Sequence, residues 1–547
     1  MPRRQRAKFT DSLHEFGKIP VVPITRESVV GGWTKFLEDS QKQLGSDWRT
    51  NVGVFAGRLP RGQSWASFWN QERIFAEHYL DQVRCAEVRV MVLGKIMGEL
   101  QIDVAPFYDV PSAKTHQNLS LDVLGLTNSI SLRDFVEIAR DIDASPELQT
   151  QEDEVKHREN LYWLRVQRAL KKRASTSVPL MVSKRLSERD EILSDDDDMD
   201  LLVMLRNRSR KRRRVLSKND VADADEMSAA ASTAIETSCT DSSDESSSDW
   251  DTSSDEEENE VTSVLNDCIR NAVLRTERRE KFDFSPMSNQ CLYAICTDGR
   301  TLFETQNGRH SPFACPRLDT LLKQMLGQAV LPGITTSFLY YGSYGSSFQW
   351  HLEDCDFFSV NFLHAGRPKV WYTVAPKHRR RFELLVRKMF RNATRSCPRP
   401  MAHKTIVIDP RDLVAAGIKV NRFVQYPGDY VILYPDTYHS GFNTGLNCAE
   451  SVNFATAEWL PHGDRALSQV HRLVQEKLCF CRNSIAFASD DSYLYVHELV
   501  RQEMQKRNLP IKTAAEHLAA FEADMKACKR KIEEYNARAL HLEHPYR

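Results

Sequence analysis

The feature that most constrains this chain is a histidine and a glutamate two residues apart, His351 and Glu353, in a run that begins at Phe348. Side chains at positions i and i+2 of a β-strand point to the same face of a sheet. A further histidine, His439, follows an apolar strand downstream. Two imidazoles and one carboxylate on one side of a metal leave coordination positions open, an arrangement typical of Fe(II) sites. The sequence therefore predicts a β-rich domain with a metal centre.

The residues after this pair read as further strands. The segment 356–372 contains two β-rich runs around a Gly-x-Pro turn. Lys369 lies on the second run, where its ammonium group is expected to neutralise an anionic co-substrate. A His-x-Glu pair by itself is common at surfaces or in hydrogen-bonded strands. The metal interpretation therefore depends on this context.

Three stretches, 333–342, 348–354 and 447–456, resemble the Jumonji (JmjC) catalytic domain. That domain is the double-stranded β-helix of Fe(II)- and 2-oxoglutarate-dependent oxygenases. The resemblance is greatest to histone lysine demethylases that carry JmjN and JmjC segments and accept trimethyl-lysine. It is dense over residues 283–482 and thin before residue 172. It implies a mixed α/β fold, with a cupin-like jelly-roll core, flanking helices and a structural zinc site.

The resemblance also implies roles for single residues. The expected iron ligands are His351, Glu353 and His439. The residues matched to the 2-oxoglutarate pocket are Lys369, Asn361, Phe303, Phe348 and Trp371. The residues matched to the methyl-lysine cage and the peptide groove are Gly333, Tyr340, Glu353, Ser451, Asn453, Asp354 and Lys404. Core packing is the alternative for Phe348 and Trp371, and surface charge is the alternative for Asp354 and Lys404.

The sequence departs from the family at three of these positions. Phe303 and Phe338 stand where the family has tyrosines, and Val452 replaces a threonine. A lost hydrogen bond to a charged group costs about 1.5–3 kcal/mol. Weaker 2-oxoglutarate binding is therefore expected if Phe303 is the matching residue, and a shift of one residue in this gapped region is the alternative.

A second metal site is expected from cysteine and histidine. Cys397 and His403 lie in one polar loop, and Cys479 and Cys481 follow the catalytic segment. Three thiolates and one imidazole form a closed tetrahedral set for structural Zn²⁺. The spacing alone does not decide whether this zinc site exists, because Cys-x-Cys is tighter than the usual Cys-x-x-Cys. The same order of ligands is a hallmark of the demethylase subfamily, so the resemblance implies the zinc site.

Charge is segregated along the chain, although 74 basic and 75 acidic residues nearly balance. A basic run extends from Arg206 to Arg214, and the tract 241–260 is rich in Ser, Asp and Glu. So few apolar residues cannot offset the conformational entropy lost on ordering. The segment 173–282 is therefore expected to be a disordered insertion. Its basic run is expected to be a nuclear-import or nucleic-acid patch, with a solvated charge run as the alternative.

The expected organisation places a disordered basic tail at 1–16, a divergent JmjN-like segment at 17–65 and a mainly helical region at 66–172. The insertion, the JmjC domain and a zinc-completing helical region follow at 173–282, 283–460 and 461–547. Apolar spacing predicts helices at 29–42, 72–99, 131–140, 154–171, 318–326 and 462–477.

The expected activity follows from the resemblance. Twelve scattered cysteines and no membrane-length apolar run predict a reducing, intracellular compartment and no membrane partner. The family removes methyl groups from tri- and dimethyl-lysine of histone tails, using Fe(II), O₂ and 2-oxoglutarate and releasing formaldehyde, succinate and CO₂. A nuclear, monomeric histone demethylase is therefore expected. The alternatives are a weak or inactive JmjC module that binds or scaffolds chromatin, and a hydroxylase of another protein side chain.

Overall fold

The computed structural model describes most of the chain outside its insertion. The described residues are 8–61, 63, 65, 75–83, 87–95, 102–103, 115–116, 119–126, 131–142, 150–174, 290–296, 300–303, 311–327, 331, 333–390, 399–404, 406–476 and 490–543. The predicted insertion at 173–282 lies outside them, except for its first two residues at the end of a helix. Within the described residues, no helix is both long enough and apolar enough to cross a membrane.

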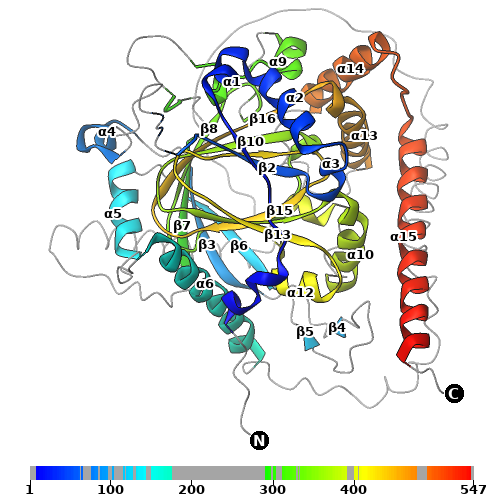
Figure 1. The fold of residues 1–547 in the computed structure, drawn as a ribbon, viewed down its shortest axis with the longest axis horizontal. Coiled ribbons are helices and arrows are strands. Elements are labelled where there is room, and N and C mark those ends of the chain that lie inside the picture. Colours follow the sequence, from blue (N-terminus) through cyan, green and yellow to red (C-terminus); the bar gives the residue numbers. More distant parts are fainter. Residues whose placement is uncertain are drawn as a thin grey trace, which may run out of the picture. The chain divides into compact units, whose positions relative to one another are not determined.

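Two β-sheets form the framework of the fold (Figure 1). In spatial order, the larger sheet contains β1 (Val21–Pro23), β2 (Val54–Arg58), β14 (Tyr430–Leu433), β10 (Phe358–Gly366), β16 (Asn447–Phe454), β8 (Phe338–Gly342), β7 (Gln290–Cys296), β3 (Glu87–Lys95), β6 (Leu119–Leu126) and β12 (Ile406–Val407). The smaller sheet contains β13 (Val420–Gln425), β11 (Lys369–Val374), β15 (Tyr438–Asn443) and β9 (Ser347–His351). A separate pair consists of β4 (Ile102–Asp103) and β5 (Thr115–His116).

The two main sheets pack face to face. Trp371 and Phe423 from the smaller sheet are buried together with Val431 and Leu433 from the larger one. Because side chains alternate along a strand, the same strands direct their other residues to the outside of this two-layer core. The space between the sheets is therefore lined by every second residue of β10, β11 and β15.

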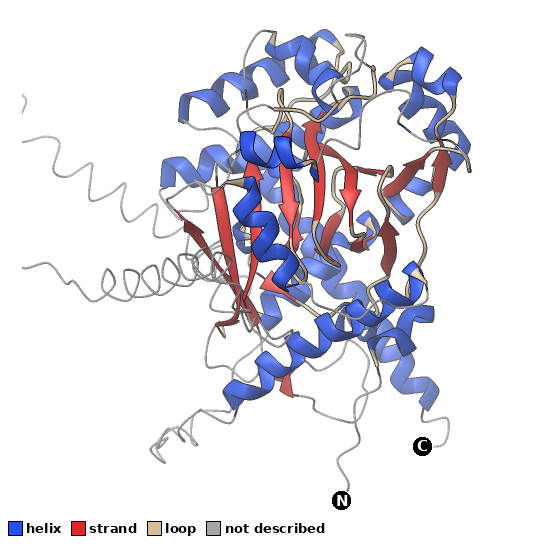
Figure 2. Ribbon diagram, turned by 90° about the vertical axis from the view of Figure 1, so that its left-hand side faces the viewer, coloured by secondary structure: helices blue, strands red, loops and turns tan. Residues whose placement is uncertain are grey.

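Helices cover the outer face of the larger sheet, and the strands lie between helices (Figure 2). The covering helices include α1 (Arg26–Gly31), α2 (Trp33–Leu44), α9 (Leu321–Leu326) and α13 (Leu460–Glu476). Trp33 packs edge-on against Phe313 and Phe454, with ring centroids 5.4 and 5.8 Å apart. The helix expected at 29–42 is thus two helices, because Gly32 adopts a left-handed φ of 86° between them.

The helices expected near 131–140, 154–171, 318–326 and 462–477 are confirmed. They correspond to α5 (Leu132–Ile142), α6 (Gln151–Ala174), α9 and α13. The other α-helices of the described residues are α3 (Trp48–Asn51), α4 (Glu77–Gln82), α10 (Arg379–Met389), α12 (Pro410–Ala415), α14 (Asp490–Lys506) and α15 (Ala514–Glu543). Short 3₁₀ turns are η1 (Phe9–Glu15), η4 (Cys315–Arg317), η5 (Asp354–Asp356), η6 (Pro376–His378), η7 (Pro400–His403) and η8 (Ala457–Trp459).

The helix predicted at 72–99 is wrong for most of its length. After the short helix α4, residues 87–95 form strand β3, which pairs with both β6 and β7. The sequence there places valine at every second position, Val88, Val90 and Val92. Valine at alternate positions favours a strand, and two flanking strands satisfy the backbone on both sides. The described part of the region 66–172 is therefore mixed rather than mainly helical.

The predicted disorder of residues 1–16 is wrong for residues 8–16. Phe9 begins η1 and is buried. Its ring stacks on Trp163 of α6 at 5.3 Å and meets Tyr372 of β11 edge-on at 6.0 Å. Phe16 is buried in the same cluster. Two aromatic side chains therefore anchor this basic segment in a pocket that is formed by distant elements of the chain.

Replacing Phe9 with alanine is expected to lower the free energy of unfolding by about 3–5 kcal/mol, the usual cost of removing a buried phenylalanine. Urea denaturation followed by tryptophan fluorescence measures the change. His14→Ala, in the same 3₁₀ turn but exposed, serves as the matched control. Equal midpoints for the two variants would show that the N-terminal segment does not contribute to the core.

Candidate metal centre

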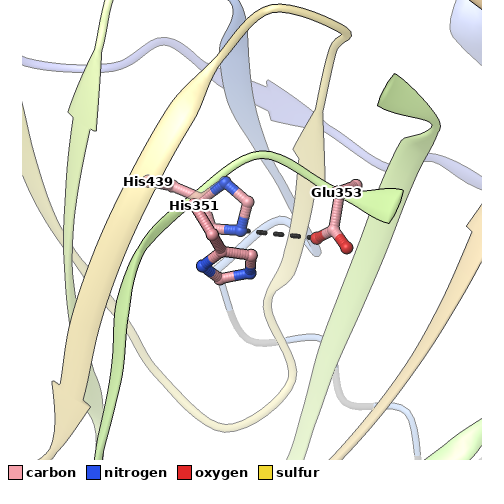
Figure 3. A group of neighbouring side chains, drawn as sticks. All are labelled: His351, Glu353 and His439. Atoms are coloured by element: carbon pink, nitrogen blue, oxygen red, sulfur yellow. Dashed lines mark ion pairs between the residues drawn. The ribbon is translucent and has the colours of Figure 1, made fainter. Parts of the chain in front are cut away.

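The three predicted ligands come together between the sheets (Figure 3). His351 ends β9 and pairs directly with His439 of β15, so the two imidazole centroids are 4.2 Å apart. Glu353 follows in extended backbone and places its Oε1 3.3 Å from His439 Nε2. Potential ligand atoms of all three lie within 4.8 Å of one another, the one such His/Cys/Asp/Glu group found in the described part of the chain.

Backbone carbonyls orient both imidazoles. His351 Nδ1 lies 2.5 Å from the carbonyl oxygen of Gln349, and His439 Nδ1 lies 3.1 Å from that of Thr437. A carbonyl only accepts, so each Nδ1 carries a proton, and in the neutral imidazole Nε2 is then the nitrogen with the lone pair. These two carbonyls were not predicted, because backbone groups leave no signature in a sequence.

The electrostatics at His351 and Glu353 favour the protonation states that bind a metal. Burial, together with the neighbouring His439, holds the pKa of His351 well below its usual value. Burial acts to raise the pKa of Glu353, but the interactions with the nearby His439, His351 and Lys404 side chains outweigh it, and the pKa lies below its usual value. Neutral imidazoles and an ionised carboxylate are the forms that coordinate divalent cations. The donor set therefore fits Fe(II), with two nitrogens and one oxygen on one side.

A buried lysine lies in the same interior. Lys369 begins β11, is 2% exposed, and has its Nζ 6.0 Å from the ring centroid of Phe348. Phe348 in turn lies 4.5 Å from the Trp371 ring. Within the described residues Lys369 forms no ion pair, and burial lowers its pKa to about 8. A buried ammonium group without a counter-charge indicates a binding position for an anion.

Gln425 orients the predicted pocket residue Asn361. The Trp371 Nε1–H donates to Gln425 Oε1 at 2.9 Å, which fixes the direction of the glutamine amide. Gln425 Nε2 then donates to Asn361 Oδ1 at 3.1 Å. The amide nitrogen of Asn361 is left as the donor for the pocket. Sequence reasoning missed Gln425, since one glutamine in a strand has no distinguishing pattern.

Phe303 lies elsewhere than its predicted role requires. Its buried ring contacts Phe362 and His364, with centroids 5.1 and 4.6 Å away. Phe362 alternates with Asn361 along β10, so the Phe303 ring is on the opposite face of that strand. The cause is Glu450, a fully buried carboxylate that accepts hydrogen bonds from Thr301 Oγ1 at 2.8 Å and Leu302 N at 3.1 Å. This anchor directs the next side chain into the core.

Of the predicted cage residues, Asn453 contacts Glu353 directly. Asn453 Nδ2 donates to Glu353 Oε2 at 3.1 Å, and the Asn453 backbone N–H donates to the Gly333 carbonyl at 2.7 Å. Gly333 has a left-handed φ of 79°, and a Cβ there would lie 3.2 Å from the Phe338 ring. Ser451 pairs with Phe338 across β16 and β8, and Tyr340 lies on the same face as Phe338 because it is two residues further along β8.

The two predicted groove residues form an ion pair. Lys404 Nζ lies 3.5 Å from Asp354 Oδ1, one residue after Glu353 in the chain. Burial raises the pKa of Asp354, against the opposing charge of Lys404. The third departure from the family, Val452, is buried in the outer core cluster with Val360. It therefore affects packing, not the cage face.

Of the predicted zinc ligands, Cys397, Cys479 and Cys481 lie outside the described residues. The backbone of His403 is described and ends η7, next to Lys404.

Residues 338–454 match the family model described as JmjC domain, hydroxylase. The matched segment runs from β8 to β16 and includes all three candidate ligands. The chain therefore carries a JmjC domain of the hydroxylase type, whose jelly-roll core is the pair of facing sheets.

The similar proteins are lysine-specific demethylases. The chain is 39% identical over 190 residues to "Lysine-specific demethylase 4D" of Rattus norvegicus, covering 35% of each chain. It is 38% identical over 186 residues to "Probable lysine-specific demethylase 4F" of Homo sapiens, covering 34% of this chain and 27% of that protein. It is 36% identical over 178 residues to "Lysine-specific demethylase 4B" of Mus musculus, covering 32% and 16%. The chain thus spans about a third or less of the length of these relatives.

Proposed function

We propose that this protein is a nuclear Fe(II)- and 2-oxoglutarate-dependent demethylase of tri- and dimethyl-lysine on histone tails. One observation carries the proposal: the His351, Glu353 and His439 set, with both imidazole Nδ1 atoms held by carbonyls, lies inside a JmjC domain similar to lysine-specific demethylases. Bound Fe(II), with O₂ and 2-oxoglutarate, supplies the oxidation of an N-methyl group, which leaves as formaldehyde while succinate and CO₂ are released.

The chain's own residues bind and orient the reactants. Lys369 neutralises the far carboxylate of 2-oxoglutarate, and Asn361, held by Gln425, donates a second hydrogen bond to it. The rings of Phe348 and Trp371 cover the apolar part of this pocket and exclude water.

The substrate lysine is bound on the side of Glu353 opposite the 2-oxoglutarate pocket. Oxygens of Gly333, Tyr340, Ser451 and Asn453 surround its methylammonium group, and Asp354 with Lys404 contacts the peptide. A phenylalanine at 338 makes this cage less polar than in the family.

The parts outside the JmjC domain have supporting roles in this proposal. Residues 17–65 act as a JmjN-like segment, supported by the pairing of β2 with β14. Zn²⁺ bound by Cys397, His403, Cys479 and Cys481 joins the loop after α10 to the C-terminal helices. The basic run from Arg206 to Arg214 directs nuclear import or contacts nucleic acid.

Mass spectrometry of trimethyl-lysine histone peptides tests the function. The full chain is incubated with Fe(II), ascorbate and 2-oxoglutarate. Stepwise loss of methylene masses that requires 2-oxoglutarate supports a demethylase and identifies the preferred lysine. Methylene loss that does not require 2-oxoglutarate, or bound metal without methyl loss or succinate, contradicts the proposal and favours a non-catalytic chromatin-binding module. A peptide that gains oxygen without losing methyl groups contradicts it in favour of a hydroxylase.

Replacing Gln425 with leucine is expected to weaken 2-oxoglutarate binding about 2- to 10-fold, because one net hydrogen bond of about 0.5–1.5 kcal/mol is lost when Asn361 is no longer oriented. Calorimetric titration of the Mn(II)-loaded protein measures it. Gln41→Leu, which removes a surface amide bound to Tyr434, is the control. Unchanged affinity in the Gln425 variant would show that Asn361 is oriented by other groups.

The affinity for 2-oxoglutarate is expected to fall as the pH rises through about 8. The buried Lys369 has a pKa lowered to about 8 in the free protein. Only its protonated form attracts a carboxylate, so the affinity is constant below this pH and decreases about tenfold per pH unit well above it. Calorimetry between roughly pH 7 and pH 9.5 measures the slope. The same slope in Lys369→Met would assign the pH dependence to another group.

A further inference from the structure

The two turns that carry Glu353 and His439 share an unusual backbone. Glu353 leads into η5, where Cys355 and Asp356 have left-handed φ values of 52° and 53°. Asp436, three residues before His439, has a φ of 67°. Non-glycine residues adopt this conformation at a cost and keep it where surrounding contacts determine it. The contacts of Asp356 and Asp436 therefore help to determine the positions of Glu353 and His439.

Two arginines from two different helices each bind both aspartates. Arg465 of α13 donates from one nitrogen to Asp356 Oδ2 and to Asp436 Oδ1, each at 2.7 Å. Arg379, the first residue of α10, donates to Asp356 Oδ2 at 3.1 Å and also pairs with Asp436 Oδ1. The four side chains, which we call the Arg–Asp clamp, connect the turn after β9 to the turn before β15.

The clamp is largely enclosed. The side chain of Asp356 is 2% exposed, and those of Arg379, Asp436 and Arg465 are 12%, 20% and 22% exposed. Two cations balance two anions, and Glu383 and His462 complete the surroundings through Arg379 Nε and Asp436 Oδ2. Charge-assisted hydrogen bonds of this kind are short and strong. Removing one partner of such a group leaves its neighbour charged and poorly solvated.

The clamp acts on metal ligands that come from separate segments. Glu353 and His439 are 86 positions apart in the chain. The distance between their side chains therefore depends on contacts between two separate segments. The backbone N–H of Asp356 donates to the Glu353 carbonyl at 3.0 Å, so a shift of Asp356 moves Glu353 directly. His439 Nδ1 is held by the carbonyl of Thr437, the residue after Asp436.

We propose that Arg379 and Arg465 are positioning residues of the metal centre, holding the turns of Glu353 and His439 at the separation that a divalent cation requires. This inference rests on the proposed iron site. According to this inference, the helices α10 and α13, which lie outside the facing sheets, contribute to metal affinity. The arginines touch neither metal nor substrate and act through the two aspartates.

Titration of the metal-free full chain with Co(II), followed by its visible absorption, tests the clamp. Arg379→Met and Arg465→Met are expected to weaken Co(II) binding roughly 10–100-fold, as loss of groups that orient metal ligands does. Arg411→Met is the matched control, because Arg411 is 12% exposed like Arg379 and pairs with Asp409, outside the clamp and its surroundings. Thermal unfolding of each metal-free variant separates metal affinity from stability.

Asp436→Gly provides a second route if an arginine variant does not fold. Glycine adopts a left-handed φ without steric strain, so this change removes the Asp436 side chain and leaves the turn conformation accessible. Weaker Co(II) binding by Asp436→Gly supports the clamp. Wild-type Co(II) affinity in the folded variants, even with a lower melting temperature, would show that the arginines only stabilise the fold and would overturn the inference. Failure of the wild-type chain to bind Co(II) would overturn the proposed function instead.

Discussion

Replacing His351 with alanine is expected to abolish 2-oxoglutarate turnover. The variant keeps only one imidazole and the Glu353 carboxylate, because no further His, Cys, Asp or Glu of the described residues joins the ligand group. Loss of a ligand is more damaging than the roughly 10–100-fold effect of losing a group that orients one. Succinate formation, measured by NMR in the presence of Fe(II) and a trimethyl-lysine peptide, gives the result.

The exposed histidine His14 provides the control for this experiment. His14→Ala carries the same chemical change on the surface of η1 and is expected to keep full turnover. Circular dichroism shows whether His351→Ala keeps its fold, which is expected because the side chain of the adjacent Trp350 remains in its core cluster. Turnover by His351→Ala within tenfold of wild type would remove His351 from the ligand set and require another residue in its place.

The metal centre could be predicted in part because two of its three ligands are close together in the sequence. The spacing of His351 and Glu353 places both side chains on one face wherever the backbone between them is extended. His439 could be added because it follows an apolar strand and fits the JmjC pattern. The structure brings these three together by pairing His351 with His439 across β9 and β15.

The parts that could not be predicted depend on contacts between distant segments. The order of residues 8–16 depends on Phe9 meeting Trp163 and Tyr372, more than 150 positions away. The segment 87–95 has valine at alternate positions, which the prediction of a helix does not take into account. Its pairing with β6 and β7 makes it a strand. Gln425 matters only because Trp371 and Asn361 lie on either side of it.

Phe303 illustrates how a matched position can differ in space. The motif aligns it with a residue of the 2-oxoglutarate pocket, but the buried carboxylate of Glu450 holds the preceding residues Thr301 and Leu302. The Phe303 ring then joins Phe362 in the outer core. A buried carboxylate with hydrogen-bond partners from three other segments, including Ser337 and His364, has no signature in the sequence. In the proposed function, recognition of the far carboxylate therefore falls mainly on Lys369 and Asn361.

Replacing Lys369 with methionine is expected to weaken 2-oxoglutarate binding by about 2–5 kcal/mol, roughly 30-fold to more than a thousandfold. Methionine keeps the length and apolar contacts of the side chain, including the neighbouring Phe348 ring, and removes only the charge. The far carboxylate is then buried without a cation, which costs more than the loss of a surface ion pair. Calorimetry on the Mn(II)-loaded protein measures the affinity.

A second ligand shows where this loss arises. 2-Oxobutyrate carries the same keto-acid end as 2-oxoglutarate and lacks the far carboxylate, so its affinity is expected to be equal in wild type and Lys369→Met. Lys377→Met, at an exposed lysine that bonds Asn51, is expected to change neither affinity. If Lys369→Met weakened both ligands equally, the lysine would serve the metal end of the pocket or its packing, and recognition of the far carboxylate would have to come from Asn361 and the backbone. Selective loss of 2-oxoglutarate binding would instead explain why this chain keeps a lysine buried at 2% exposure without an ion pair among the described residues.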